Sequence, residues 1–132
     1  MAVNMTDEEL VKMACEAKNT AYAPYSGFRV GAALLTGNGK VYTGANIENI
    51  SYGATNCAER TAVFKAVSDG EREIKAVAVA SDSADFIYPC GICRQVLAEF
   101  GKKGMKIVCS SGKGGIKVFT LDEMLPDAFV RL

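Results

Sequence analysis

The sequence predicts an α/β fold in which a mixed five-stranded sheet carries helices on both faces, as a three-layer α/β/α sandwich. Helical and strand-like segments alternate along most of the chain. Two of the helical segments begin with capping boxes, and a Gly-Asn-Gly turn at 37–39 joins the first two strands as a hairpin. With 132 residues and no visible repeat or linker, the chain is expected to form one domain over 1–132.

The first half of the chain supplies two helices and a hairpin. Thr6 and Glu9 form the first capping box, which opens a helix that ends before the turn at 24–27. The expected segments that follow are a strand over 28–36, the turn at 37–40, a strand over 41–44, a polar loop over 46–56 and a helix over 57–67.

The second half begins with a β-branched and alanine-rich run at 74–80, which is typical of a strand covered on both faces. A loop at 81–89, a helix over 90–100, strands over 106–109 and 116–119 and a short helix opened by Thr120 and Glu123 complete the order. The glycine-rich turn at 112–115 leads into a strand and lacks the Lys-Ser/Thr of a phosphate-binding loop, so we interpret it as a hairpin turn.

Composition excludes several classes of function. Fifteen basic and fifteen acidic residues cancel, which disfavours a nucleic acid as the main partner, because such binding depends on neutralising phosphates. No apolar run is long enough to predict a membrane-spanning helix. Residues 1–9 lack the features of a signal peptide, so we expect a cytoplasmic protein with reduced cysteines.

The chemistry is concentrated in Cys57-Ala58-Glu59 and Pro89-Cys90-Gly91-Ile92-Cys93. Each segment is expected at the start of a helix, where free N–H groups and the helix dipole stabilise thiolates. Cys90 and Cys93 are three residues apart, so both sulfur atoms project to one side of the first turn. Three thiolates bind Zn²⁺ and leave one position open, which is typical of a catalytic site.

Two neighbours suit such a site. Glu59 is a candidate to take the proton of an activated water and pass it to a substrate. Arg60 is a candidate to donate hydrogen bonds to a coordinating sulfur and so compensate the thiolate charge. A structural zinc site would need a fourth ligand, but the chain has no histidine, and Cys15 and Cys109 fit better as small buried residues.

These two segments resemble the zinc deaminase pattern, in which Cys-x-Glu precedes Pro-Cys-x-x-Cys. Residues 22–32, 44–49 and 125–129 resemble the matching parts of the small cytidine deaminases, so the similarity runs from about 6 to 129. Two local differences are the bulky Ile92 inside Cys-x-x-Cys and the small Gly27. Neither is a proposed ligand.

The resemblance implies a cytidine deaminase-like fold and a hydrolase that acts on the C–N bond of a cyclic amidine. It would convert cytidine and deoxycytidine to uridine and deoxyuridine with release of ammonia, in pyrimidine salvage. The family pattern implies one Zn²⁺ per subunit and a homotetramer whose sites are completed by neighbouring subunits. Matched to this sequence, it assigns zinc to Cys57, Cys90 and Cys93, proton transfer to Glu59, and substrate binding to Phe28, Asn46, Glu48, Tyr52, Ala58 and Phe129.

Taken alone, the residues support these assignments unevenly. Asn46 and Glu48 alternate with Ile47, so both can point to one face and bind hydroxyl groups, although solvated loop residues would look the same. Phe28 by itself is more typical of a core residue. Two rival functions remain: a deaminase of another amine, such as an aminonucleoside antibiotic or a nucleic-acid base, and a non-catalytic zinc-binding interaction module.

Overall fold

A computed structural model describes residues 5–130. The expectation about a leader at the start of the chain, and the two ends of the expected domain over 1–132, therefore fall partly outside the described residues. The elements follow in the order α1 (Asp7–Ala17), the 3₁₀ turn η1 (Lys18–Thr20), β1 (Val30–Thr36), β2 (Val41–Ala45), η2 (Tyr52–Ala54), α2 (Ala58–Ser68), β3 (Ile74–Ser81), α3 (Gly91–Phe100), β4 (Gly101–Ser110), β5 (Ile116–Thr120) and α4 (Leu121–Met124).

The five strands form one sheet in the order β2-β1-β3-β4-β5. Strands β3 and β4 run parallel, and the other three neighbouring pairs run antiparallel. The parallel pair is joined through α3, which is the crossover that such a pair requires. The predicted mixed five-stranded sheet is confirmed.

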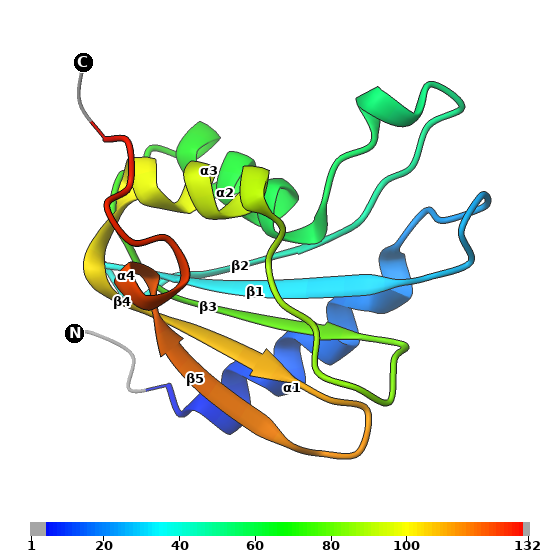
Figure 1. Cartoon of the computed structure of the whole chain (residues 1–132), viewed down its shortest axis with the longest axis horizontal. Helices are drawn as coiled ribbons and strands as arrows, with labels where there is room; N and C mark the ends of the chain where they lie inside the picture. Colours follow the sequence, from blue (N-terminus) through cyan, green and yellow to red (C-terminus); the bar gives the residue numbers. More distant parts are fainter. Residues whose placement is uncertain (1–4, 131–132) are drawn as a thin grey trace.

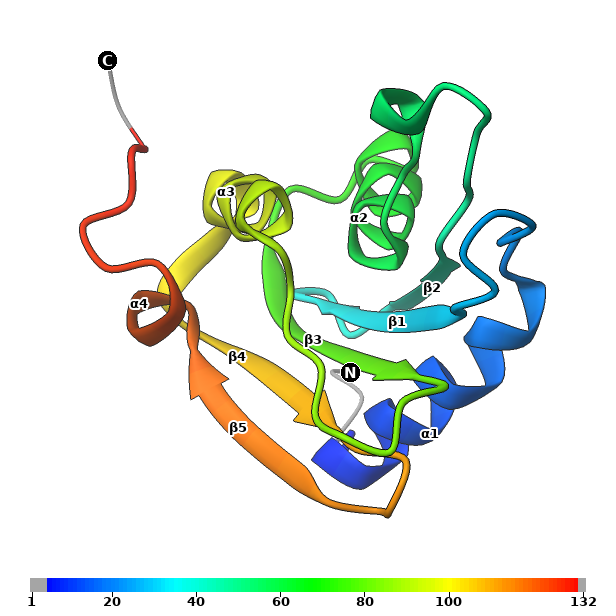
Figure 2. The same ribbon diagram turned by 45° about the vertical axis from the view of Figure 1, so that its right-hand side comes forward.

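Helices cover both faces of the sheet, as Figures 1 and 2 show. On one face, Leu10 and Ala14 of α1 are buried against the sheet in one core cluster. On the other face, α2 and α3 lie side by side, and Val63 and Leu97 are fully buried in a second cluster. The three-layer arrangement is therefore confirmed. Within residues 5–130, no helix is both long and apolar enough to cross a membrane.

Both capping boxes form as predicted. The Thr6 hydroxyl accepts from Glu9 N, and the Glu9 carboxylate accepts from Thr6 N, each at 3.1 Å. Thr120 and Glu123 make the same reciprocal pair at the start of α4. Each box satisfies backbone donors that have no partner inside the helix.

Two strand boundaries differ from the expectation. Strand β1 begins at Val30 rather than at residue 28, because the backbone just before it bonds to side chains. Strand β4 begins at Gly101, directly after α3, rather than at residue 106. Its exposed start carries two lysines between two glycines, and such a sequence lacks the alternating apolar residues by which a strand is predicted.

Helix α2, which starts next to Cys57, lies very close to β2. A Cβ atom placed on Gly44 of β2 would come within 2.7 Å of both Ala62 N and Ala58 O. Only glycine permits this approach of helix to strand without a shift. The small residue therefore fixes how closely the beginning of α2 sits on the sheet.

Candidate metal centre and active-site cavity

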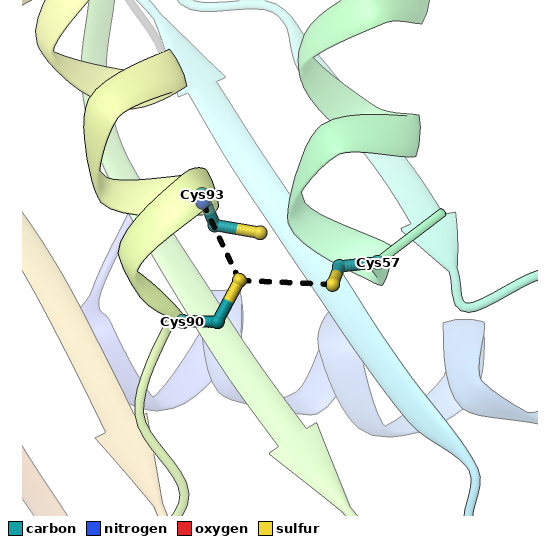
Figure 3. Close-up of side chains that lie close together, drawn as sticks. All are labelled: Cys57, Cys90 and Cys93. Atoms are coloured by element: carbon teal, nitrogen blue, oxygen red, sulfur yellow. Dashed lines mark hydrogen bonds between the residues drawn. The ribbon is translucent and has the colours of Figure 1, made fainter. Parts of the chain in front are cut away.

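The starts of α2 and α3 bring three cysteines together. Cys57 is the N-cap residue of α2, Cys90 is the N-cap residue of α3, and Cys93 lies in the first turn of α3. Their sulfur atoms all lie within 4.8 Å of one another, and those of Cys57 and Cys90 are 3.9 Å apart (Figure 3). The predicted ligand set is thus assembled from two separate segments.

The cluster fits a zinc ion in spacing and in donor type. Zn–S bonds of about 2.3 Å in a tetrahedron place sulfur atoms about 3.8 Å apart, close to the distance between Cys57 and Cys90. Over residues 5–130, no other cysteine and no acidic side chain joins these three cysteines as a fourth ligand. Three protein ligands leave one coordination position for a water or a substrate.

Arg60 reaches the cluster as predicted. Its Nη2 donates to Cys57 Sγ at 3.2 Å. Its buried Nε has no partner among the side chains and backbone of residues 5–130. Hydrogen bonding from Cys93, reinforced by Arg60, lowers the pKa of Cys57 to about 5, and the same sulfur contact raises the pKa of Cys93. The centre therefore already favours a thiolate at Cys57.

Glu59 lies next to the cluster in the first turn of α2, and its side chain is only 5% exposed. Burial raises the pKa of its carboxyl group to about 7. A carboxyl group that titrates near neutrality can both accept and donate a proton. Glu59 therefore combines a titratable carboxyl group with a position beside the cysteine sulfur atoms.

A cavity of about 520 Å³ opens beside the cysteines. Cys57, Cys90 and Glu59 line it, together with three residues predicted to bind substrate: Phe28, Asn46 and Ala58. Its wall combines apolar surface with a few polar groups, as is typical of sites for small molecules. A larger hollow of about 670 Å³, near the end of α3 and the C-terminal segment, contains none of these residues.

Asn46 lines the cavity and forms hydrogen bonds with the backbone at the beginning of β1. Its Nδ2 donates to Phe28 O at 2.9 Å, and its Oδ1 accepts from Val30 N at 2.8 Å. Asn46 is buried, so it is not a solvated loop residue. Phe28 is 39% exposed, and the interpretation of this ring as a core residue is wrong.

Glu48 and Tyr52 line a neighbouring cavity of about 370 Å³, which shares Thr55 with the first one. Asn46 and Glu48, which flank the half-exposed Ile47, therefore line two adjoining hollows that share Thr55. The ring of Tyr52 packs edge-on against Tyr25, with 6.0 Å between ring centroids.

Phe129 lines neither of these two cavities in its own chain. The residue is 66% exposed, and its carbonyl oxygen accepts from Gln95 Nε2 at 2.7 Å. The end of the described chain is thereby attached to α3. This placement leaves the Phe129 ring available to another molecule.

Sequence reasoning missed several lining residues. Thr55, Arg94 and the segment 86–89 line the main cavity. Arg94 also ties two segments together, because its Nε donates to Pro89 O and its Nη1 to Met124 O, each at 2.9 Å. Apart from Thr55, these residues lie in or next to the Pro-Cys-x-x-Cys segment. Their position in the sequence was therefore the only feature that could have predicted that they line the cavity.

The remaining cysteines lie elsewhere. Cys109 is fully buried in the core cluster beneath α2 and α3, as expected. Cys15 is half-buried and packs against the cluster beneath α1. Neither sulfur belongs to the metal centre.

Comparisons with known proteins agree with this geometry. Residues 4–110 match the family model of the cytidine and deoxycytidylate deaminase zinc-binding region. The chain is 51% identical over 125 residues to a cytidine deaminase from Halalkalibacterium halodurans, covering 95% of both chains. The crystal structure of a cytidine deaminase from Burkholderia pseudomallei superposes on this chain with a TM-score of 0.91. The two sequences are 48% identical, and the match covers 95% of this chain and 100% of the other. The chain belongs to the family of zinc-dependent cytidine and deoxycytidylate deaminases.

Proposed function

We propose that this chain, as a single domain over 1–132, catalyses the hydrolytic deamination of cytidine and deoxycytidine to uridine and deoxyuridine. The observation that carries the proposal is the buried Glu59 beside three clustered cysteine sulfur atoms, next to a cavity that Glu59, Cys57 and Cys90 line. The family to which the chain belongs supports the same reaction. Ammonia is the second product.

Cys57, Cys90 and Cys93 would hold one Zn²⁺ per subunit, which would supply the Lewis acidity that makes a water nucleophilic near neutral pH. Glu59 carries protons in the reaction. Its carboxylate takes one proton from the attacking water and passes it to N3 of the cytosine ring as the oxygen atom adds to C4. It then takes the second proton from that oxygen atom and passes it to the amino group, so that the C4–N bond breaks, ammonia leaves and C4 becomes a carbonyl carbon. Arg60 offsets the charge of three thiolates through its contact with Cys57.

The cavity wall binds the flat base. Phe28 packs on the pyrimidine ring, and Ala58, the first residue of α2, contacts the base. Phe28 is well placed because Asn46 holds its carbonyl oxygen. In a pocket that is largely apolar and excludes water, preorganised hydrogen-bonding groups stabilise charge that develops on the ring.

Asn46 and Glu48 bind the sugar hydroxyl groups. The hydrogen bond from Ser26 lowers the pKa of Glu48, so its carboxyl group is ionised and acts only as an acceptor at neutral pH. An ionised carboxylate near the sugar repels a phosphate. Cytidine 5′-monophosphate should therefore be a poor substrate, and a rate comparable to that of cytidine would contradict this arrangement.

We propose that the active form is a homotetramer in which Tyr52 and Phe129 help to close sites with neighbouring subunits. Both side chains are largely exposed in the isolated chain, at 75% and 66%. Tyrosine and phenylalanine are enriched at the core of protein interfaces. Sedimentation equilibrium should give four times the chain mass, and a monomer that is fully active would contradict the proposal.

The balanced charge favours a free nucleoside over a nucleic acid as the partner, and we propose a cytoplasmic, salvage role. A substrate panel tests the reaction. Cytidine, deoxycytidine, adenosine, an aminonucleoside antibiotic and single-stranded DNA are offered to the zinc-loaded protein, with ammonia release as the readout.

Turnover restricted to the first two substrates supports the proposal, and preferred turnover of another amine supports the rival deaminase. A non-catalytic zinc module predicts no turnover and four sulfur ligands in zinc-edge spectroscopy. Four sulfur ligands would therefore contradict a catalytic centre.

A further inference from the structure

Residues 25–29, which lead into β1, form no regular strand. Side-chain oxygen atoms accept four of their backbone N–H groups, and the fifth, Gly27 N, donates to Ala23 O. Tyr25 N and Ser26 N donate to Glu48 Oε1 at 2.9 and 3.1 Å. Arg29 N donates to Asp82 Oδ2 at 3.1 Å. The shape of this segment therefore depends on side-chain acceptors that lie far away in the sequence.

The Ser26 hydroxyl group is the centre of this arrangement. It accepts from Phe28 N at 3.0 Å and donates to Glu48 Oε2. A hydroxyl group has one proton and two lone pairs, so it can make both bonds at once. Because Phe28 N is only a donor and an ionised carboxylate only an acceptor, the Ser26 proton must point to Glu48.

We infer that Ser26 is a positioning residue that couples the sugar-binding carboxylate of Glu48 to the base-packing ring of Phe28. This inference rests on the proposed function. The Ser26 hydroxyl group bonds to both the Glu48 carboxylate and the Phe28 backbone, so it fixes the position of the sugar-binding group relative to the base-packing ring. Ser26 itself lines the smaller cavity beside Glu48, away from the cysteines and Glu59.

A purely local role for Ser26 is the alternative, because bonds from a serine hydroxyl to the amide two residues later are common in turns. The chain contains a matched example. Ser83 Oγ accepts from Asp85 N at 3.0 Å, the same turn contact. Among the described residues, Ser83 has no hydrogen bond to Glu48, so Ser83→Ala removes a turn bond without removing the coupling.

The test compares Ser26→Ala, Ser26→Thr and Ser83→Ala with the parent, all zinc-loaded. Ser26 is exposed, so the smaller and larger side chains fit without repacking. Ser26→Ala should raise KM for cytidine about tenfold, since hydrogen bonds to charged groups are among the stronger ones, while kcat stays within about threefold. Ser26→Thr, which keeps the hydroxyl group, and Ser83→Ala should stay within about threefold of the parent in both constants.

Calorimetric titration with uridine gives a second measurement that needs no turnover. The dissociation constant of Ser26→Ala should rise by a factor similar to that of KM. An active parent with unchanged constants in Ser26→Ala, or no rescue by Ser26→Thr, would overturn the inference and leave the proposed function intact. A folded, zinc-loaded parent that neither binds uridine nor converts cytidine would overturn the proposed function, and this inference with it.

Discussion

Replacing Gly44 by alanine tests how the fold holds the metal centre. In β2, an added Cβ would lie 2.6 Å from Ala62 N and 2.7 Å from Ala58 O, whereas ordinary contact begins at 3.4 Å. Both opposing atoms belong to the backbone of α2 and cannot rotate away. The helix must therefore retreat from the sheet by about 0.8 Å, an overpacking change that costs about 1–3 kcal/mol.

The same displacement reaches the metal centre, because Cys57 is the N-cap residue of α2, whereas Cys90 and Cys93 belong to α3. Metal–ligand distances tolerate changes of only about 0.2 Å. A shift of α2 by about 0.8 Å should thus lower zinc affinity, by about tenfold or more. The thermal midpoint should fall by about 3–15 °C.

Gly104→Ala is the matched control. An added Cβ at Gly104 meets nothing within 4 Å, and its backbone does not need a positive φ. This variant should be neutral or slightly stabilising. Thermal unfolding with and without zinc, and competition with a chromophoric chelator, measure both effects. If Gly44→Ala matched Gly104→Ala in midpoint and zinc affinity, the close packing of α2 on β2 would not govern the centre.

Three further predictions follow from single contacts. Arg60→Ala should lose zinc faster to a chelator and unfold at a lower temperature, because Cys57 loses its donor at 3.2 Å; unchanged zinc content would contradict the charge compensation. Leu97→Ala should lower the free energy of unfolding by about 2–5 kcal/mol in urea denaturation, since Leu97 is fully buried, and a change below about 1 kcal/mol would refute its core position. Asp82→Asn should lower the thermal midpoint at pH 7. Hydrogen bonding from Arg29 lowers the pKa of Asp82 to about 2 in the folded state. The difference in thermal midpoint between Asp82→Asn and the parent should therefore shrink as pH falls from about 3.9 towards 2. A difference that stays constant over this pH range would exclude the ion pair.

The metal centre was predictable because its geometry is largely local. Two helix starts carry the three clustered cysteines, and the spacing of Cys90 and Cys93 places both on one turn. The fold class followed from the alternation of elements and from capping boxes, which depend on residues a few positions apart. Only the meeting of the two helix starts needed the tertiary structure.

The cavity beside the cysteines was less predictable because segments that are distant in the sequence form it. Its wall at Phe86 is held by Lys117, whose ammonium group lies 4.4 Å from the centre of the ring. Nothing in either local sequence indicates this pairing. The exposure of Phe28 likewise depends on Asn46 and Ser26, which bind its backbone on both sides.

The most direct test of the account compares the parent with Glu59→Gln, both loaded with zinc. Glutamine keeps the size of the buried side chain but cannot shuttle a proton. Conversion of cytidine to uridine, followed by ultraviolet absorbance, should be rapid in the parent and should fall by about 10²–10⁴-fold or more in the variant. Zinc content should stay the same, because Glu59 is not among the clustered ligands. Equal rates in the two proteins would contradict the assignment of Glu59, and with it the proposed reaction mechanism.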